Sequence, residues 1–100
     1  MILYNLTINI DKTVEREWLN WMRAEHVPAI MATGLPLSHK ILHLLTEVDN
    51  GGATYTFQFS FRIKLDFYRF QKYHGDDLME KIQERFGTQY VTFQSLLEEV

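Results

Sequence analysis

Two segments of the chain alternate between apolar and polar residues, in residues 2–10 and in residues 54–61, with Leu3 as the one apolar residue at a polar position. A period of two residues predicts a strand with one buried face, so each segment is expected to lie in a sheet that is covered on one side. The apolar positions are Ile2, Tyr4, Leu6, Ile8 and Ile10 in the first segment, and Tyr55, Phe57, Phe59 and Phe61 in the second.

Residues 13–34 are predicted to form one long amphipathic helix between these strands. Thr13 is placed to cap the first turn, and Gly34 is placed to end the last one. At about 100° per residue the apolar positions form one stripe, with Trp21 at its centre and Glu25 as its only charge. The stripe consists of Val14, Trp18, Trp21, Met22, Glu25, Ala29 and Ala32.

Pro28 interrupts this helical pattern. It has no N–H to donate to the carbonyl of Ala24, and it disfavours helical geometry at Val27. A kink or break is therefore expected at His26-Val27. Glu25 then has two readings. Its carboxyl group faces the core and is desolvated, which favours the protonated form, or it curls outward and the proline only ends the helix early.

The second half of the chain repeats the alternation of strands and helices. A hairpin is predicted at Asp49–Gly52, and Gly75 is predicted to break the second helix, with Asp76 or Asp77 capping its second piece. The predicted elements are a strand at His39–Val48, the strand that holds residues 54–61, a helix at 65–86 and a strand at Gln89–Leu97. In the last strand Val91, Phe93 and Leu97 are expected to face the helices, and Tyr90, Thr92 and Gln94 to face away from them.

The order β-α-β-β-α-β predicts an α+β, ferredoxin-like fold: a four-stranded antiparallel sheet with both helices on one face, in a single domain at 1–100. The other face is then polar but almost uncharged. This favours a surface partly shielded from water, because solvated faces collect Lys and Glu; a plain solvated face rich in Thr is the alternative. Its predicted members are Asn5, Thr7, Asn9, Thr54, Thr56, Gln58, Ser60, Thr92 and Gln94, with His39 and His43 or their neighbours.

Size and charge narrow the classes of partner. A chain of 100 residues is marginal alone, which favours a homodimer through the polar sheet face. A net charge of -3 gives no basic field for nucleic acid. Cysteine is absent, and no signal peptide or membrane span is apparent, so a cytoplasmic protein is expected.

The whole chain resembles a small family of uncharacterised bacterial proteins in the dimeric α/β-barrel superfamily. The resemblance implies a dimer whose two sheets pack face to face, with a pocket between sheet and helices in each subunit. The superfamily includes cofactor-free quinol monooxygenases, haem-degrading monooxygenases, lactone isomerases and stress proteins, and fold alone does not choose among them. The matching motifs are Tyr4–Asp11, Trp18–Met22, Glu25-His26-Val27-Pro28, Ala32-Thr33-Gly34, Arg85-Phe86-Gly87 and Leu96-Leu97-Glu98.

Acid-base residues lie at both helix irregularities, and aromatic residues accompany them. Three functions stay open: binding of a small apolar or aromatic molecule between sheet and helices, a cofactor-independent monooxygenase or isomerase, and a structural or regulatory dimer without ligand. The haem-degrading relatives use a strand asparagine, a tryptophan and a helix histidine, but both tryptophans here lie in the first helix. No cofactor and no metal site are expected, since His39 and His43 stand about 13 Å apart along a strand. The candidate catalytic residues are Glu25, His26 and His74, and the candidate ligand-binding residues are Tyr4, Asn5, Trp21 and Tyr73.

Overall fold

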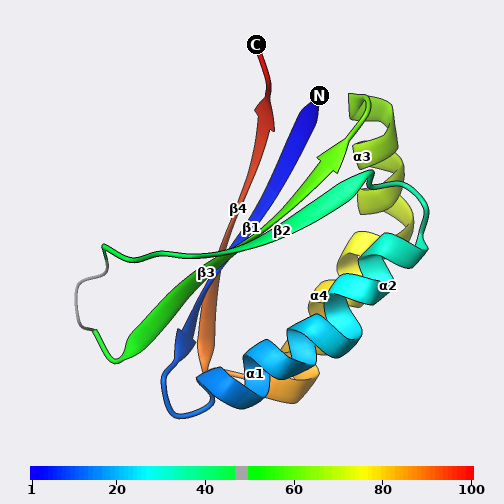
Figure 1. Ribbon diagram of the computed structural model, residues 1–100. Coiled ribbons are helices and arrows are strands. Elements are labelled where there is room, and N and C mark those ends of the chain that lie inside the picture. Colours follow the sequence, from blue (N-terminus) through cyan, green and yellow to red (C-terminus); the bar gives the residue numbers. More distant parts are fainter. Residues whose placement is uncertain (47–49) are drawn as a thin grey trace.

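The computed structural model describes residues 1–46 and 50–100 and has the predicted order of elements. Its four strands form one antiparallel sheet in the order β2-β3-β1-β4, and Figure 1 shows both helical segments on the same face of this sheet. The predicted ferredoxin-like α+β fold is therefore confirmed. The strands are β1 (Ile2–Asp11), β2 (Ser38–His43), β3 (Gly52–Phe61) and β4 (Tyr90–Glu98); the first helical segment is α1 (Glu15–Trp21), η1 (Met22–His26) and α2 (Val27–Ala32), and the second is α3 (Lys64–Phe70), η2 (Gln71–Gly75) and α4 (Asp76–Phe86).

The core lies between the helices and the two central strands, β1 and β3. Their predicted alternation is confirmed, because the apolar residues of both strands are buried under the helices. The register pairs Tyr4 with Phe59 and places aromatic rings beside aliphatic side chains. Trp18 of α1 packs on the aromatic side chains of β3, with its ring centroid 5.5 Å from that of Tyr55 and 5.6 Å from that of Phe57.

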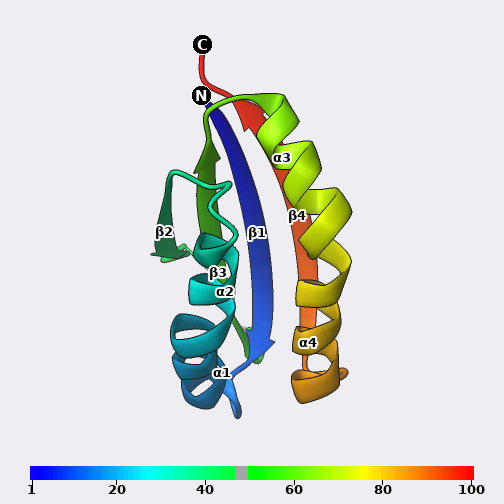
Figure 2. The same cartoon turned by 90° about the vertical axis from the view of Figure 1, so that its right-hand side faces the viewer.

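Both helical segments run through a π turn in the middle instead of breaking. Val27 keeps helical dihedral angles, φ -62° and ψ -47°, and its N–H bonds to the carbonyl of Met22, so of the kink or break expected at His26-Val27 the break does not occur. The second segment likewise continues through Gly75 into α4, and neither Asp76 nor Asp77 forms a side-chain cap. Figure 2 shows the two segments running alongside each other over the sheet.

The π turn in η1 changes which residues of the first segment face the core. A π turn takes one more residue than an α turn, so the phase of the following residues shifts. Glu25 is exposed and His26 is buried, which corrects the reading in which Glu25 faces the core. Trp18, 0% exposed, holds the centre of the stripe that was predicted for Trp21.

The beginning of the first segment also differs from the expectation, and its end does not. Thr13 does not cap the helix, because α1 begins at Glu15, one residue later than a cap at Thr13 requires. The Thr13 side chain donates instead to the carboxylate of Asp11 at 2.8 Å. Gly34 ends the segment as predicted, with φ 75°.

The edge strands reverse two predicted faces. Phe93 lies opposite Thr7 and Thr92 lies opposite Ile8, so Val91, Phe93 and Leu97 point away from the helices, and Tyr90, Thr92 and Gln94 point toward them. On β2, His39 lies opposite Phe59 on the helix side of the sheet, and so does His43 opposite Tyr55, which corrects their placement on the outer face. The predicted continuation of this strand to Val48 and the turn residue Asp49 reach residues 47–49, outside the described residues.

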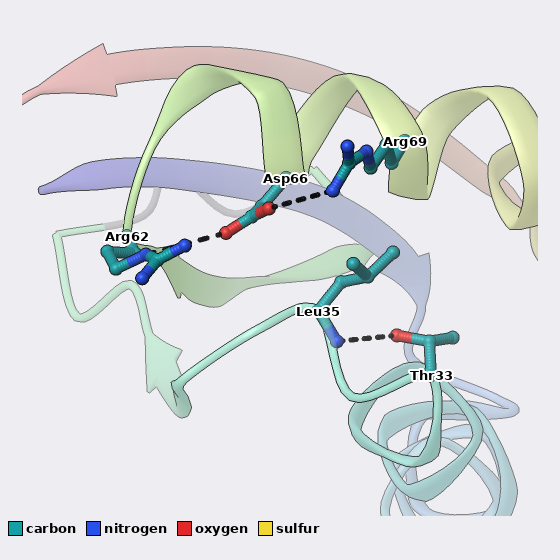
Figure 3. Close-up of polar contacts among 5 residues, drawn as sticks. All are labelled: Thr33, Leu35, Arg62, Asp66 and Arg69. Atoms are coloured by element: carbon teal, nitrogen blue, oxygen red, sulfur yellow. Dashed lines mark hydrogen bonds and ion pairs between the residues drawn. The ribbon is translucent and has the colours of Figure 1, made fainter.

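Surface polar contacts mark the end of α2 and the beginning of α3, as drawn in Figure 3. The hydroxyl of Thr33 accepts a hydrogen bond from the N–H of Leu35 at 3.3 Å. Asp66 lies 3.9 Å from both Arg62 and Arg69, whose side chains are exposed. Exposed ion pairs contribute little, so packing holds the segments on the sheet. Across the described parts of the chain, no helix has the length and apolar character to cross a membrane.

Candidate functional site

A hollow lies between the two helical segments, not between sheet and helices. It has a volume of about 440 Å³ and brings three of the predicted site residues together: Trp21, Glu25 and His26. This is within the range of roughly 300–1,000 Å³ that is typical of small-molecule sites. Its lining is completed by Ala29 on the first segment and by Leu78, Lys81, Glu84 and Arg85 on α4.

His26 is the buried polar residue of this groove. It is 2% exposed, and neither ring nitrogen has a hydrogen-bond partner in the described part of the chain. Burial, together with the nearby ammonium of Lys81, lowers the pKa of His26 to about 4, so the ring is neutral at pH 7. A buried polar group without a partner costs about 1–3 kcal/mol, and a ligand that supplies one would recover part of this energy.

Trp21 forms an aromatic wall of the groove next to His26. The two ring centroids lie 6.0 Å apart, and the ring of Phe86 meets Trp21 edge-on at 5.6 Å. The guanidinium of Arg85 lies 5.8 Å from the centroid of Trp21 and 3.8 Å from the carboxylate of Glu17. Trp21 is thus held in place by α4, and it is partly buried rather than sealed in the core.

A second hollow of about 320 Å³ adjoins the first and contains His74. The two hollows share Ala29, Leu78 and Lys81, so they form one groove between the segments. His26 lies in the π turn of one segment and His74 in the π turn of the other. π turns occur frequently at functional sites, and here each one places a histidine along the same groove.

The other predicted ligand-binding residues lie elsewhere. Tyr4 borders a smaller hollow of about 160 Å³ between β1, α3 and β4, where its hydroxyl donates to Gln94 at 2.8 Å and burial raises its pKa to about 12. Asn5 lies on the outer face of the sheet and accepts a hydrogen bond from Gln58 at 3.0 Å. Tyr73 is exposed on η2. The structure does not bring Tyr4, Asn5 and Tyr73 to the groove, and their roles stay predictions.

Sequence reasoning missed the residues that α4 contributes to the groove. Leu78, Lys81 and Arg85 are spaced three and four residues apart, which puts them on one side of a helix. That spacing was the only available signal. Charged residues on a helix normally indicate a solvated face, and only the packing of the two segments shows that this side borders a groove.

Solved structures with the same fold cover almost the whole chain. HapK from Hahella chejuensis is 8% identical, with a TM-score of 0.71 over 100% of this chain and 93% of that one. An antibiotic biosynthesis monooxygenase is 16% identical, with a TM-score of 0.66 over 100% and 99%. A mutant of MhuD with two manganese protoporphyrin IX molecules bound per active site is 14% identical, with a TM-score of 0.67 over 100% and 95%.

These likenesses define a ferredoxin-like α+β protein whose structural neighbours include proteins of the antibiotic biosynthesis monooxygenase type. At such identities they show the fold alone. Residues 1–100 match the family described as Domain of unknown function (DUF4286), and the chain belongs to that family. Among curated proteins, none matches.

Proposed function

We propose that this protein is a homodimer that binds a small aromatic molecule in the groove between its helical segments. The observation that carries the ligand half of the proposal is His26: a buried, neutral, unpartnered imidazole at a groove with a tryptophan wall. The space between sheet and helices, where the sequence suggested a ligand, is largely filled by Trp18, Met22 and the phenylalanines of β3. The hollow beside Tyr4 that stays open there is about 160 Å³, below the usual range for ligand sites.

The homodimer half is supported by the outer face of the sheet. Val91 and Phe93 are 67% and 68% exposed on this face, next to hydroxyl and amide side chains that hydrogen-bond across β1, β2 and β3. Apart from Asp11 at the end of β1, Lys40 is the only charged residue that the described strands place on this face. Exposed apolar side chains on a nearly uncharged surface are typical of an interface.

The area of this face suits a second copy of the chain. Four strands about 4.8 Å apart and some nine residues long cover roughly 600 Å² of projected surface. A standard interface buries about 800 Å² of accessible surface per partner. Side chains that project from the sheet make its accessible surface larger than its projected area, so this face can supply that amount.

Charge substitution on the outer face tests the homodimer. Light scattering at tens of micromolar should give the mass of two chains for the wild type and of one chain for Phe93→Asp. Leu65→Asp is the matched control, because Leu65 is 50% exposed on α3 and lies off the outer face. A wild-type monomer, or a Phe93→Asp dimer of unchanged affinity, contradicts the proposed interface.

NMR shift mapping with naphthalene derivatives tests the ligand half. Addition of the ligand should shift the resonances of Trp21, His26 and Leu78. Shifts confined to Tyr4 and Phe67 would instead support a site between sheet and helices. No shift with any derivative would favour a structural or regulatory dimer without ligand.

Binding is proposed ahead of catalysis because of the chemistry of His26. A pKa of about 4 makes its neutral ring a weak base, poorly matched to proton abstraction near pH 7. The monooxygenase or isomerase hypothesis then depends on His74, which is only partly buried in the adjoining hollow. Turnover of a bound aromatic compound that His74→Ala abolishes would favour this alternative.

A further inference from the structure

We propose that the groove between the helical segments takes an aromatic carboxylate, with its ring against Trp21 and its carboxylate at the ammonium group of Lys81. This inference rests on the proposed function, since it names the ligand class of the same site. It goes beyond that function by assigning the charge of the ligand and the residue that recognises it.

The position of Lys81 supports a carboxylate ligand. It lines both hollows of the groove, and it is the only charged residue that does so among the described ones. No ion pair within the described residues includes Lys81, whereas Arg85 already lies 3.8 Å from the carboxylate of Glu17. Lys81 is therefore the cation of this groove that still lacks an acidic partner.

The charge that acts on the buried imidazole of His26 also supports a carboxylate ligand. Besides burial, the ammonium of Lys81 lowers the pKa of His26. The charge of Lys81 therefore reaches the buried side of the groove, where His26 lies. A carboxylate bound there would be attracted, and an ammonium ligand would be repelled.

The hydrogen-bonding groups of the neutral His26 imidazole also suit a carboxylate ligand. Neutral His26 keeps one N–H donor and one acceptor nitrogen, and both lack partners. We expect a bound carboxylate to accept a hydrogen bond from this N–H as well as from the ammonium of Lys81. A volume of about 440 Å³ is sufficient for a two-ring system.

The groove also has acidic residues, which by themselves would favour a cationic ligand. Glu25 and Glu84 line the first hollow and Asp77 the second, and all three residues are exposed. Arg85 counters them on the Trp21 side, and His74 lies at the far end of the groove. Lys81 is exposed as well, but it borders both hollows, whereas each of these acids borders only one of them.

Three ligands with the same ring and different charges decide the matter. The dimeric protein is titrated with 2-naphthoate, 2-naphthamide and 2-naphthylmethylammonium, and binding is followed by the NMR shifts of Trp21 and His26. We expect 2-naphthoate to bind about tenfold more tightly than the amide, as one charge-assisted hydrogen bond allows, and the ammonium compound to bind most weakly. Bound naphthoate should also raise the pKa of His26, because an anion stabilises the imidazolium.

Lys81→Met should bring the Kd of naphthoate to within about twofold of the Kd of the amide. Lys64→Met is the matched control, since Lys64 is an exposed lysine at the beginning of α3 that lines neither hollow and lies off the outer face of the sheet, and it should leave the preference unchanged. Tightest binding of the ammonium compound would overturn the proposal, and so would equal binding of all three or a preference that survives Lys81→Met. In each of these cases aromatic binding in the groove still stands; only the failure of all three ligands to bind there contradicts the proposed function as well.

Discussion

The central strands and the edge strand β4 turn opposite sides of their side-chain pattern toward the helices. β1 and β3 turn their apolar residues toward the helices, where they are sealed. β4 turns Val91 and Phe93 to the outer face, where about two thirds of each remains exposed. Alternation thus shows which residues share a face, and the position of a strand in the sheet determines which face is covered.

The polar inner side of β4 explains the difference. Thr92 and Gln94 point to the helix side of the sheet but stay exposed. Gln94 accepts a hydrogen bond from the hydroxyl of Tyr4. The helices therefore cover the central strands more completely than this edge, and the apolar side of β4 stays exposed.

The largest expected effect comes from the same substitution on the two faces. Phe59→Ala on β3 removes a fully buried ring and should lower the free energy of unfolding by about 3–5 kcal/mol. Phe93→Ala should cost less than about 1 kcal/mol in dilute protein, where the outer face is solvated. Its cost should grow with protein concentration if the face forms the dimer interface. Urea titrations at two protein concentrations measure both values, and equal losses at the two positions would contradict the comparison.

The buried layer has a pH-sensitive element in His26. Its unfolded pKa is near 6.5 and its folded pKa is about 4, so the unfolded state binds more protons in this window. Stability should therefore fall as the pH drops from about 6.5 toward 4, by about 3 kcal/mol from this group. His26→Gln should remove this part of the slope, whereas His74→Gln should retain it. If the free energy of unfolding of His26→Gln depends on pH as steeply as that of the wild type, the His26 ring takes up a proton in the folded state as readily as in the unfolded state.

A smaller effect is expected where the core meets the edge strand. Tyr4→Phe removes the buried hydroxyl that donates to Gln94 and should cost about 1 kcal/mol. Tyr90→Phe is the matched change, because the Tyr90 hydroxyl donates to Gln83 at 2.9 Å at an exposed position, and it should cost a few tenths. A larger loss at Tyr90 would mean that the edge strand is held mainly from α4.

The limits of prediction follow from the same contrast. β1 and β3 were predicted with the correct buried face because the apolar side chains of each strand, mostly aliphatic in β1 and mostly aromatic in β3, gather almost entirely on one face. The faces of β4 were predicted wrongly, since its alternation is equally compatible with either side.

The same holds for the candidate site. Trp21 and His26 were predicted and lie together, but the π turn that buries His26 leaves no periodic signal. Lys81 looks like any solvated lysine until α4 is packed beside the first segment.

Glu25→Gln should have the smallest effect. The π turn places Glu25 outside and His26 inside, so the free energy of unfolding should change by less than about 0.5 kcal/mol from pH 5 to 8. Stabilisation near neutral pH would indicate a desolvated carboxyl group facing the core, and destabilisation at pH 7 would indicate an ionised structural partner. Since Glu25 also borders the groove, its neutralisation removes one repulsive charge from the rim. It should therefore tighten the binding of 2-naphthoate by no more than about twofold, which separates the effect of this acid from that of Lys81.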